Sequence, residues 1–73
     1  MKQVNYIGSA VRRLRMDKHM SQEALAKASG ISPSAICRYE CGNREPGIKA
    51  IMAIADALGL TVSKIYLTAA EME

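Results

Sequence analysis

The residues with the strongest intrinsic chemistry in this chain are two thiols and one imidazole. Cys37 and Cys41 are the only cysteines among the 73 residues, and His19 is the only histidine. One imidazole without a nearby nucleophile or acid pair makes no catalytic site, and the cysteine spacing differs from that of paired zinc ligands. The sequence therefore predicts no enzyme, no metal or cofactor site and no small-molecule substrate.

The two thiols can be interpreted in two ways. Their spacing of four residues places Cys37 and Cys41 on one side of a helix, so a redox or metal-sensing role is conceivable. The alternative is that both are incidental small residues. Two cysteines are too few for the disulfide scaffold of a secreted protein, so we expect a cytoplasmic, reducing location.

The charge balance is basic. The net charge is +3, but Glu71 and Glu73 lie near the end, which leaves residues 1–64 with a net charge of +5. A basic body suits a polyanionic partner, although many domains of this charge bind nothing anionic. No apolar run approaches the roughly 20 residues of a membrane span, so we expect no membrane partner.

The elements that must position these residues are helices. Apolar residues recur at spacings of three and four, and no useful alternating pattern is present, so we predict an all-α fold. The predicted apolar face of the fourth helix is made by Ile48, Ile51, Ile54, Ala55 and Leu58. The predicted helices run from Val4 to about Lys18, Gln22 to Ser29, Pro33 to about Glu40, Ile48 to Leu58, and from Thr61 through Leu67. The length suggests one domain, residues 1–73, with a short fraying tail at 69–73.

The second and third predicted helices share the same local signals. Ser21 and Ser32 are N-caps whose hydroxyls can accept a backbone N–H of the first turn. Gly30 ends the second helix, and with Ala26 it is small enough to let the two helices approach closely. Residues 21–42 therefore predict a helix-turn-helix, in which the second helix protrudes and can enter a DNA major groove.

This stretch resembles the helix-turn-helix of the phage repressor and Cro family, also called XRE-like. The resemblance rests on the runs Met20–Ser32, Ile36–Gly42, Arg44–Pro46 and Ile54–Val62, and it covers about residues 7–67. It implies a compact, lambda-repressor-like domain of five helices that binds operator DNA, commonly as a two-fold dimer. On this resemblance we expect a transcriptional regulator of bacterial or phage origin, a repressor that binds an inverted repeat as a homodimer.

The resemblance also implies which side chains meet DNA. The recognition helix is about residues 33–40, and Arg38 is its strongest base reader because a guanidinium can bond O6 and N7 of guanine together. The expected base contacts are Pro33, Ser34, Cys37 and Arg38. The expected phosphate contacts are Gln22, Ser32, Asn43, Arg44 and Lys49. The alternative for Pro33 is a residue that only starts the helix, and for Arg38 it is a phosphate contact or a solvated charge. For the others the alternative is an ordinary solvated surface position.

Two further assignments follow from the resemblance. Arg15 and Glu40 occupy positions similar to a structural ion pair between the first and third helices of the family. Four apolar residues near the fifth helix either form a dimer interface or simply close the core: Leu60, Val62, Tyr66 and Leu67.

The chain also departs from the family pattern. Cys37 and Cys41 replace the polar or charged residues usual at these positions, and a thiol in the groove would make DNA binding sensitive to oxidation. Pro33, Ser34 and Cys37 offer few strong hydrogen-bonding groups, which leaves two rival functions. One is an antitoxin or restriction-modification controller of the same fold, although the short tail argues against an antitoxin. The other is a protein-interaction module without specific DNA binding, which would lack a steep salt dependence on DNA.

Overall fold

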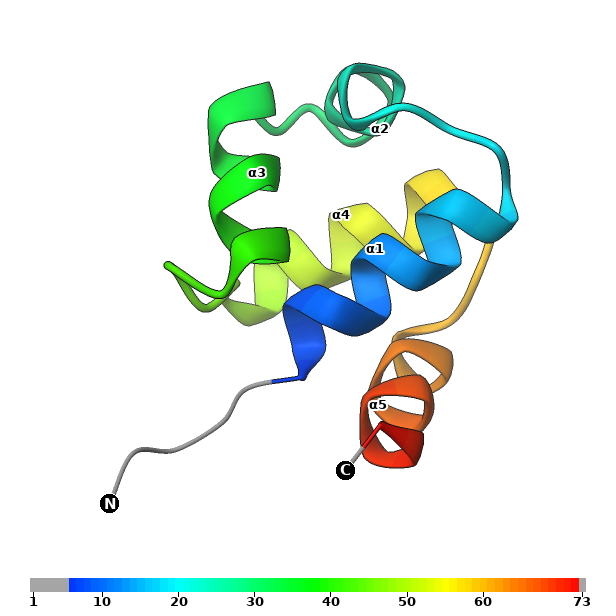
Figure 1. Cartoon of the computed structure of the whole chain (residues 1–73). Helices are drawn as coiled ribbons and strands as arrows, with labels where there is room; N and C mark the ends of the chain where they lie inside the picture. The colour runs from blue at the N-terminus through cyan, green and yellow to red at the C-terminus, as the bar shows by residue number, and fades with distance from the viewer. Residues whose placement is uncertain (1–5, 73) are drawn as a thin grey trace.

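The computed structural model describes residues 6–72, which form five helices and contain no strand (Figure 1). The helices are α1 (Ile7–Asp17), α2 (Gln22–Ser29), α3 (Pro33–Cys41), α4 (Ile48–Leu58) and α5 (Val62–Glu71). The all-α prediction is confirmed. The predicted start of the first helix at Val4 lies outside the described residues, and α1 begins at Ile7 after Tyr6.

Helix α1 is central to the packing. It contacts α3, α4 and α5, while α2 is held against α3 and α4 (Figure 1). Each helix contributes one large, fully buried aliphatic side chain to the shared core: Val11, Leu25, Ile36, Ile54 and Ile65. Burial of one such side chain stabilises the fold by roughly 1.5–3 kcal/mol. These five residues therefore anchor every helix to one common centre.

The predicted N-caps of α2 and α3 are confirmed. The Ser21 hydroxyl accepts from the Ala24 N–H at 3.0 Å, and the Ser32 hydroxyl accepts from the Ala35 N–H at 3.1 Å. Gly30 ends α2 with a φ of 76°, in the left-handed region that favours glycine. A Cβ at Gly30 would meet nothing within 4 Å, so its role is the turn conformation and not the predicted close helix approach.

Two expectations at the C-terminal half are corrected. The tail predicted from residue 69 is helical up to Glu71, because Ala69 continues the inward stripe of Ile65 and is buried. The Thr68 hydroxyl is satisfied by donating to the Lys64 carbonyl at 2.7 Å. Ile48 does not belong to the inward face of α4: its side chain is 58% exposed, and burial begins at Ile51.

No single helix within residues 6–72 is long and apolar enough to cross a membrane. Helices α4 and α5 meet that length and composition only as a pair bent by 97°, a criterion that buried core helices also meet.

Candidate nucleic-acid interface

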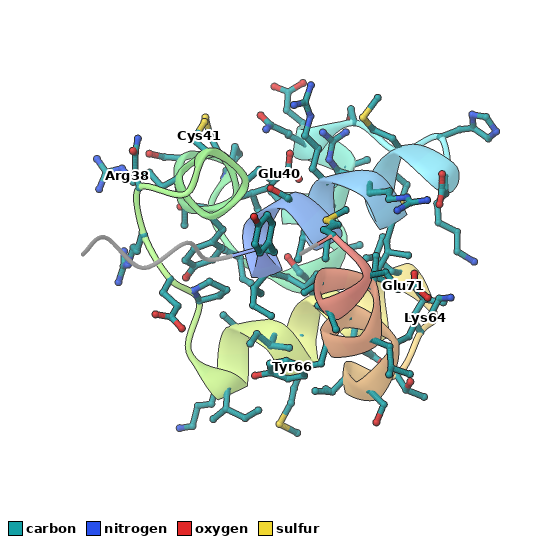
Figure 2. The ribbon with its side chains drawn as sticks, turned by 60° about the horizontal axis from the view of Figure 1, so that its bottom comes forward. Arg38, Glu40, Cys41, Lys64, Tyr66 and Glu71 are labelled. Atoms are coloured by element: carbon teal, nitrogen blue, oxygen red, sulfur yellow. The ribbon has the colours of Figure 1, made fainter. Side chains whose placement is uncertain are left out.

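Helix α3 has two sides with opposite environments. Its inward side buries Ile36, Tyr39 and Glu40, which recur at the spacing of one helical face. Its outward side carries the four predicted base contacts, and all four are exposed: Pro33, Ser34, Cys37 and Arg38. Arg38 projects from the edge of the molecule in Figure 2. The inward side thus holds α3 against the core, and the outward side is exposed to solvent.

The position of α3 depends on a close approach to α1 at Gly8. A Cβ at this buried glycine would collide with the carbonyl oxygen of Tyr39 on α3. Only glycine allows the two backbones to come so near. Residues near Gly8 in the chain do not reveal this contact, although a glycine inside an apolar helical pattern is itself a signal of a packing constraint.

The ion pair between Arg15 and Glu40 is present and bidentate. Arg15 Nε lies 2.8 Å from Oε2 of Glu40, and Nη2 lies 2.9 Å from Oε1, with both side chains nearly buried. Arg15 Nη1 also donates to the Met20 carbonyl at 2.7 Å. The hydrogen bond to Glu40 raises the pKa of Arg15 above its ordinary value. This guanidinium therefore joins α1, the turn after it and α3.

Gln22 has a partner that the sequence did not indicate. Its amide Nε2 donates to Oε1 of Glu40 at 3.0 Å, and the residue is half-buried. One amide N–H and the amide oxygen remain for another ligand. Gln22 therefore supports the ion pair first, and only its remaining amide group is available for the phosphate contact predicted from the sequence.

The other four predicted phosphate contacts are exposed: Ser32, Asn43, Arg44 and Lys49. Ser32 precedes α3, whereas Asn43 and Arg44 follow it, so polar groups lie at both ends of the helix. The backbone N–H groups of Asn43 and Arg44 both donate to the Arg38 carbonyl, at 3.0 and 3.3 Å. These bonds fix the loop against the last turn of α3, which orients both side chains.

The thiols lie on one side of α3, as their spacing predicted. The Sγ atoms of Cys37 and Cys41 are 3.9 Å apart, and both residues are exposed. The hydrogen bond with Cys37 raises the pKa of Cys41. Within residues 6–72 no group of three or more histidine, cysteine or acidic side chains is placed to hold a metal ion.

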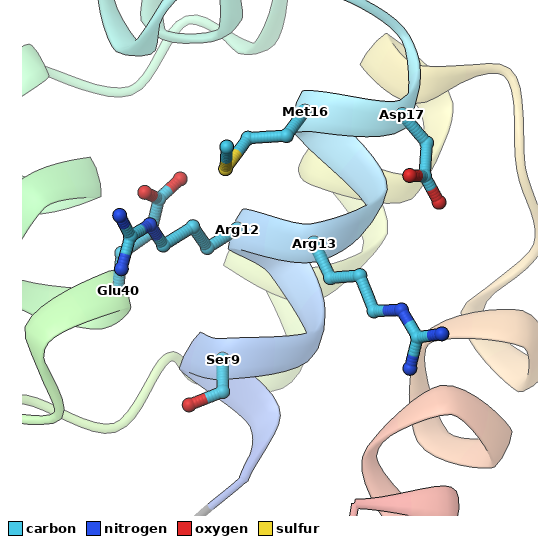
Figure 3. A pocket seen from close by; sticks show the side chains of 6 residues that line it. All are labelled: Ser9, Arg12, Arg13, Met16, Asp17 and Glu40. Atoms are coloured by element: carbon cyan, nitrogen blue, oxygen red, sulfur yellow. The ribbon is translucent and has the colours of Figure 1, made fainter.

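A hollow between α1 and α3 contains Arg12, a cation to which the sequence assigns no role. It is lined by Ser9, Arg12, Arg13, Met16, Asp17 and Glu40 (Figure 3). Arg12 reaches toward α3, whereas Arg13 points toward α5 in the same view. A neighbouring hollow places Arg12 beside Cys41. Arg12 therefore extends the positive charge of the α3 surface onto α1.

The four predicted dimer residues do not share one environment. Leu60 and Val62 are half-buried and pack against the core. Tyr66 and Leu67 are 45% and 62% exposed, and the exposed Met52 and Ile48 of α4 add to the apolar surface. Tyr66 belongs to α5, and Figure 2 places it beside α4, away from Arg38 and Cys41. The exposed Tyr66 is thus separate from the outward side of α3.

Comparison with known proteins finds helix-turn-helix proteins that are similar to this chain in sequence and in structure. The helix-turn-helix model HTH_3 matches residues 11–65. An uncharacterized HTH-type transcriptional regulator of Mycobacterium tuberculosis is 34% identical over 66 residues, which are 90% of this chain and 47% of the relative. The chain thus spans about half the length of that relative.

Two solved structures show the same arrangement. The clp gene regulator ClgR from Corynebacterium glutamicum gives a TM-score of 0.90 at 29% identity, covering 97% of this chain and 95% of the other. The restriction-modification controller protein C.AhdI from Aeromonas hydrophila gives a TM-score of 0.80 at 33% identity, covering 82% and 91%.

Proposed function

This chain belongs to the HTH_3 family of helix-turn-helix proteins, the XRE-like type of transcriptional regulators, and on that premise we propose that it represses transcription by binding operator DNA. In this proposal α3 enters the major groove and reads base edges. The protein works in the cytoplasm of a bacterial cell, at the nucleoid, and occludes polymerase at the promoter.

The observation that carries the proposal is the division of α3 into a fixed side and a free side. The fixed side is held by the Gly8 contact and by the bidentate Arg15–Glu40 pair. An α-helix with its side chains is about 10–12 Å wide, which matches a major groove about 12 Å wide. Contacts on the inward side hold the orientation of α3, and its exposed outward side is free to contact base edges in the groove.

Arg38 is the base reader in this proposal. It is exposed, and its side chain projects beyond the ribbon (Figure 2). A bidentate bond from its guanidinium to guanine is worth roughly 1–3 kcal/mol of discrimination against other bases. Pro33, Ser34 and Cys37 form the rest of the base-facing surface, where Ser34 can donate and Pro33 can contact a thymine methyl.

The groups around α3 hold the phosphate backbone. Ser32, Asn43, Arg44 and Lys49 are assigned to this task, and Gln22 contributes its remaining amide group. Each cation that neutralises a phosphate releases counterions, so DNA binding should weaken steeply as salt rises. Arg12 is placed to add a further contact from α1.

We assign the exposed apolar side chains of α4 and α5 to a homodimer interface. The centre of this interface is formed by the exposed residues Tyr66, Leu67, Met52 and Ile48. It is supported from the core side by the half-buried Leu60 and Val62. A two-fold axis there would repeat α3 on the same face of the DNA, with half-sites about 34 Å apart on an inverted repeat.

A second candidate function keeps the same DNA surface. C.AhdI is a restriction-modification controller protein, and its likeness to this chain is 33% identity with a TM-score of 0.80. Control of a restriction-modification system by this chain would use the same operator reading by α3. The two candidates differ in the genes beside the operator, not in the site.

Selection of bound sequences from a random DNA pool tests the proposal, with wild type and Arg38→Ala in parallel. We expect wild type to enrich an inverted repeat, and the variant to lose preference at one position of each half-site. Enrichment of no sequence, with only weak and salt-sensitive binding, would contradict specific DNA recognition and favour the protein-interaction module.

A further inference from the structure

The proposed function uses Cys37 only as part of the base-facing surface, and it gives the reactivity of the α3 thiol pair no task. The geometry points to a two-sulfur binding site for trivalent arsenic, formed by Cys37 and Cys41 on the outward side of α3. The inference that occupation of this site releases DNA rests on the proposed function. The binding itself does not.

The distance between the sulfurs fits a bridging atom. A bond from sulfur to an ion such as zinc is about 2.3 Å; two bonds of that length separate the sulfurs by about 3.8 Å at a tetrahedral angle, and by about 3.5 Å at the roughly 100° angle of pyramidal trivalent arsenic. The Sγ atoms of Cys37 and Cys41 are 3.9 Å apart. A small rotation of the two exposed side chains brings the sulfurs to the arsenic distance, so one atom can bond both while the backbone of α3 stays helical.

A direct disulfide fits this position less well. A disulfide needs Cβ atoms about 3.8 Å apart, whereas residues four apart on a helix have Cβ atoms about 5–6 Å apart. Joining Cys37 to Cys41 would therefore require the last turn of α3 to distort. A bridging atom avoids this distortion, because two sulfurs bonded to one atom lie farther apart than two sulfurs bonded to each other.

The number of ligands favours trivalent arsenic over a structural metal ion. A closed zinc site needs four protein ligands, and in residues 6–72 no third histidine, cysteine or acidic group joins the pair. Trivalent arsenic bonds two sulfurs and keeps a hydroxyl or organic group as its third substituent. The hollow lined by Arg12, Gln22 and Glu40 opens beside Cys41 and gives that substituent room.

The reaction balances without a change of oxidation state. Two As–S bonds form and two As–OH bonds break, and each thiol proton leaves with a hydroxide as water. Both thiols are exposed, so the reagent reaches them in the folded protein. The adduct would then occupy the space beside Cys37 and Arg38 that DNA bases need.

The first test uses phenylarsine oxide as the probe on the reduced protein, followed by intact mass and a count of free thiols. We expect one equivalent to add, to consume both thiols, and to resist a large excess of 2-mercaptoethanol while a dithiol removes it. With Cys37→Ser or Cys41→Ser, the monothiol should remove the adduct. These exposed positions leave the core intact, which circular dichroism checks.

A matched control keeps the thiol count but separates the thiols. The double variant Cys41→Ser with Ser63→Cys has one thiol on α3 and one at an exposed position of α5, and these two helices lie apart (Figure 1). Its arsenical should be removed by the monothiol. A wild-type adduct removed as easily as this control, or one equivalent on each thiol, would overturn the site.

The second test measures DNA binding by fluorescence anisotropy, with 2-mercaptoethanol present throughout. Phenylarsine oxide should weaken binding of wild type at least tenfold and leave Cys41→Ser unchanged relative to its untreated form. A stable adduct with unchanged DNA binding would overturn the regulatory part alone. If untreated wild type binds no DNA, the proposed function fails, and the mass measurement still decides the arsenic site.

Discussion

The contact between α1 and α3 and the exposed surface of α4 and α5 represent two opposite ways of using a small helical surface. At the α1–α3 contact, backbones touch at Gly8, and the buried charges of Arg15 and Glu40 bond each other and further groups. At the α4–α5 surface, Leu67 and Met52 are more than half exposed. The first region fixes a helix, and the second leaves apolar area free to associate.

The contrast between the two regions predicts how substitutions in each should act. Changes at the α1–α3 contact should lower the free energy of unfolding, because every group there has a partner. Changes on the outward side of α3 or on α5 should spare folding and alter binding or association. Substitutions in each region test that division.

Gly8→Ala should destabilise the fold on the order of 4 kcal/mol, since the new Cβ collides with the Tyr39 carbonyl and forces α1 and α3 apart. Chemical denaturation measures the effect. Gly47→Ala is the control, because its φ is −74° and a Cβ there meets nothing within 4 Å. Helix propensity alone would make Gly8→Ala stabilising by about 1 kcal/mol, so an increase in stability would contradict the close approach.

Glu40→Ala should cost about 3 kcal/mol, because it leaves the nearly buried Arg15 guanidinium without its partner. Denaturation curves again give the value, and the exposed Glu45→Ala is the control. A double variant that makes both ion-pair residues apolar, Arg15→Met with Glu40→Leu, should lose less than the two single changes together. Simple additivity of the two single losses would show that the pair is not coupled.

Arg38→Ala should weaken binding to the selected operator by about 2 kcal/mol, roughly thirtyfold, and leave the unfolding midpoint unchanged. Anisotropy titrations on the operator and on a version with the contacted base changed measure the loss. Arg13→Ala, which removes an exposed arginine that points away from α3, should weaken binding far less. Equal losses for both variants would assign Arg38 to general charge attraction.

Leu67→Ser should raise the dimer dissociation constant several-fold, equivalent to about 1 kcal/mol, because it removes exposed apolar area without touching the core. Analytical ultracentrifugation over a range of concentrations measures the change. Ser63→Ala on the same helix provides the comparison. A dimer constant unmoved by Leu67→Ser would place the interface elsewhere.

The sequence predicted the features that depend on neighbours in the chain. Ser21 and Ser32 were identifiable as caps because their hydroxyls bond backbone groups three residues away. The inward faces of the helices followed from the spacing of apolar residues, apart from Ile48 at the exposed start of α4. The sequence predicts a fraying tail from residue 69, whereas α5 continues to Glu71 because Ala69 extends the buried stripe of Ile65.

Features that join distant segments were harder to predict. The need for glycine at position 8 arises only when the chain brings Tyr39 against it. The amide of Gln22 was assigned to DNA because nothing in its local sequence reveals that Glu40 lies within 3.0 Å. The assignments of Arg38 and of the phosphate contacts come from the family resemblance, and they stay predictions until DNA binding is measured.

The bonds that converge on Glu40 have a consequence for the kinetics of recognition. Since α1, α2 and α3 are already joined by Arg15 and Gln22 before any ligand arrives, the ordering entropy of this unit is lost during folding rather than during association. The encounter with DNA should then resemble the docking of a preorganised body. Association rates should be governed by orientation and charge, and sequence discrimination should be expressed as the lifetime of the complex.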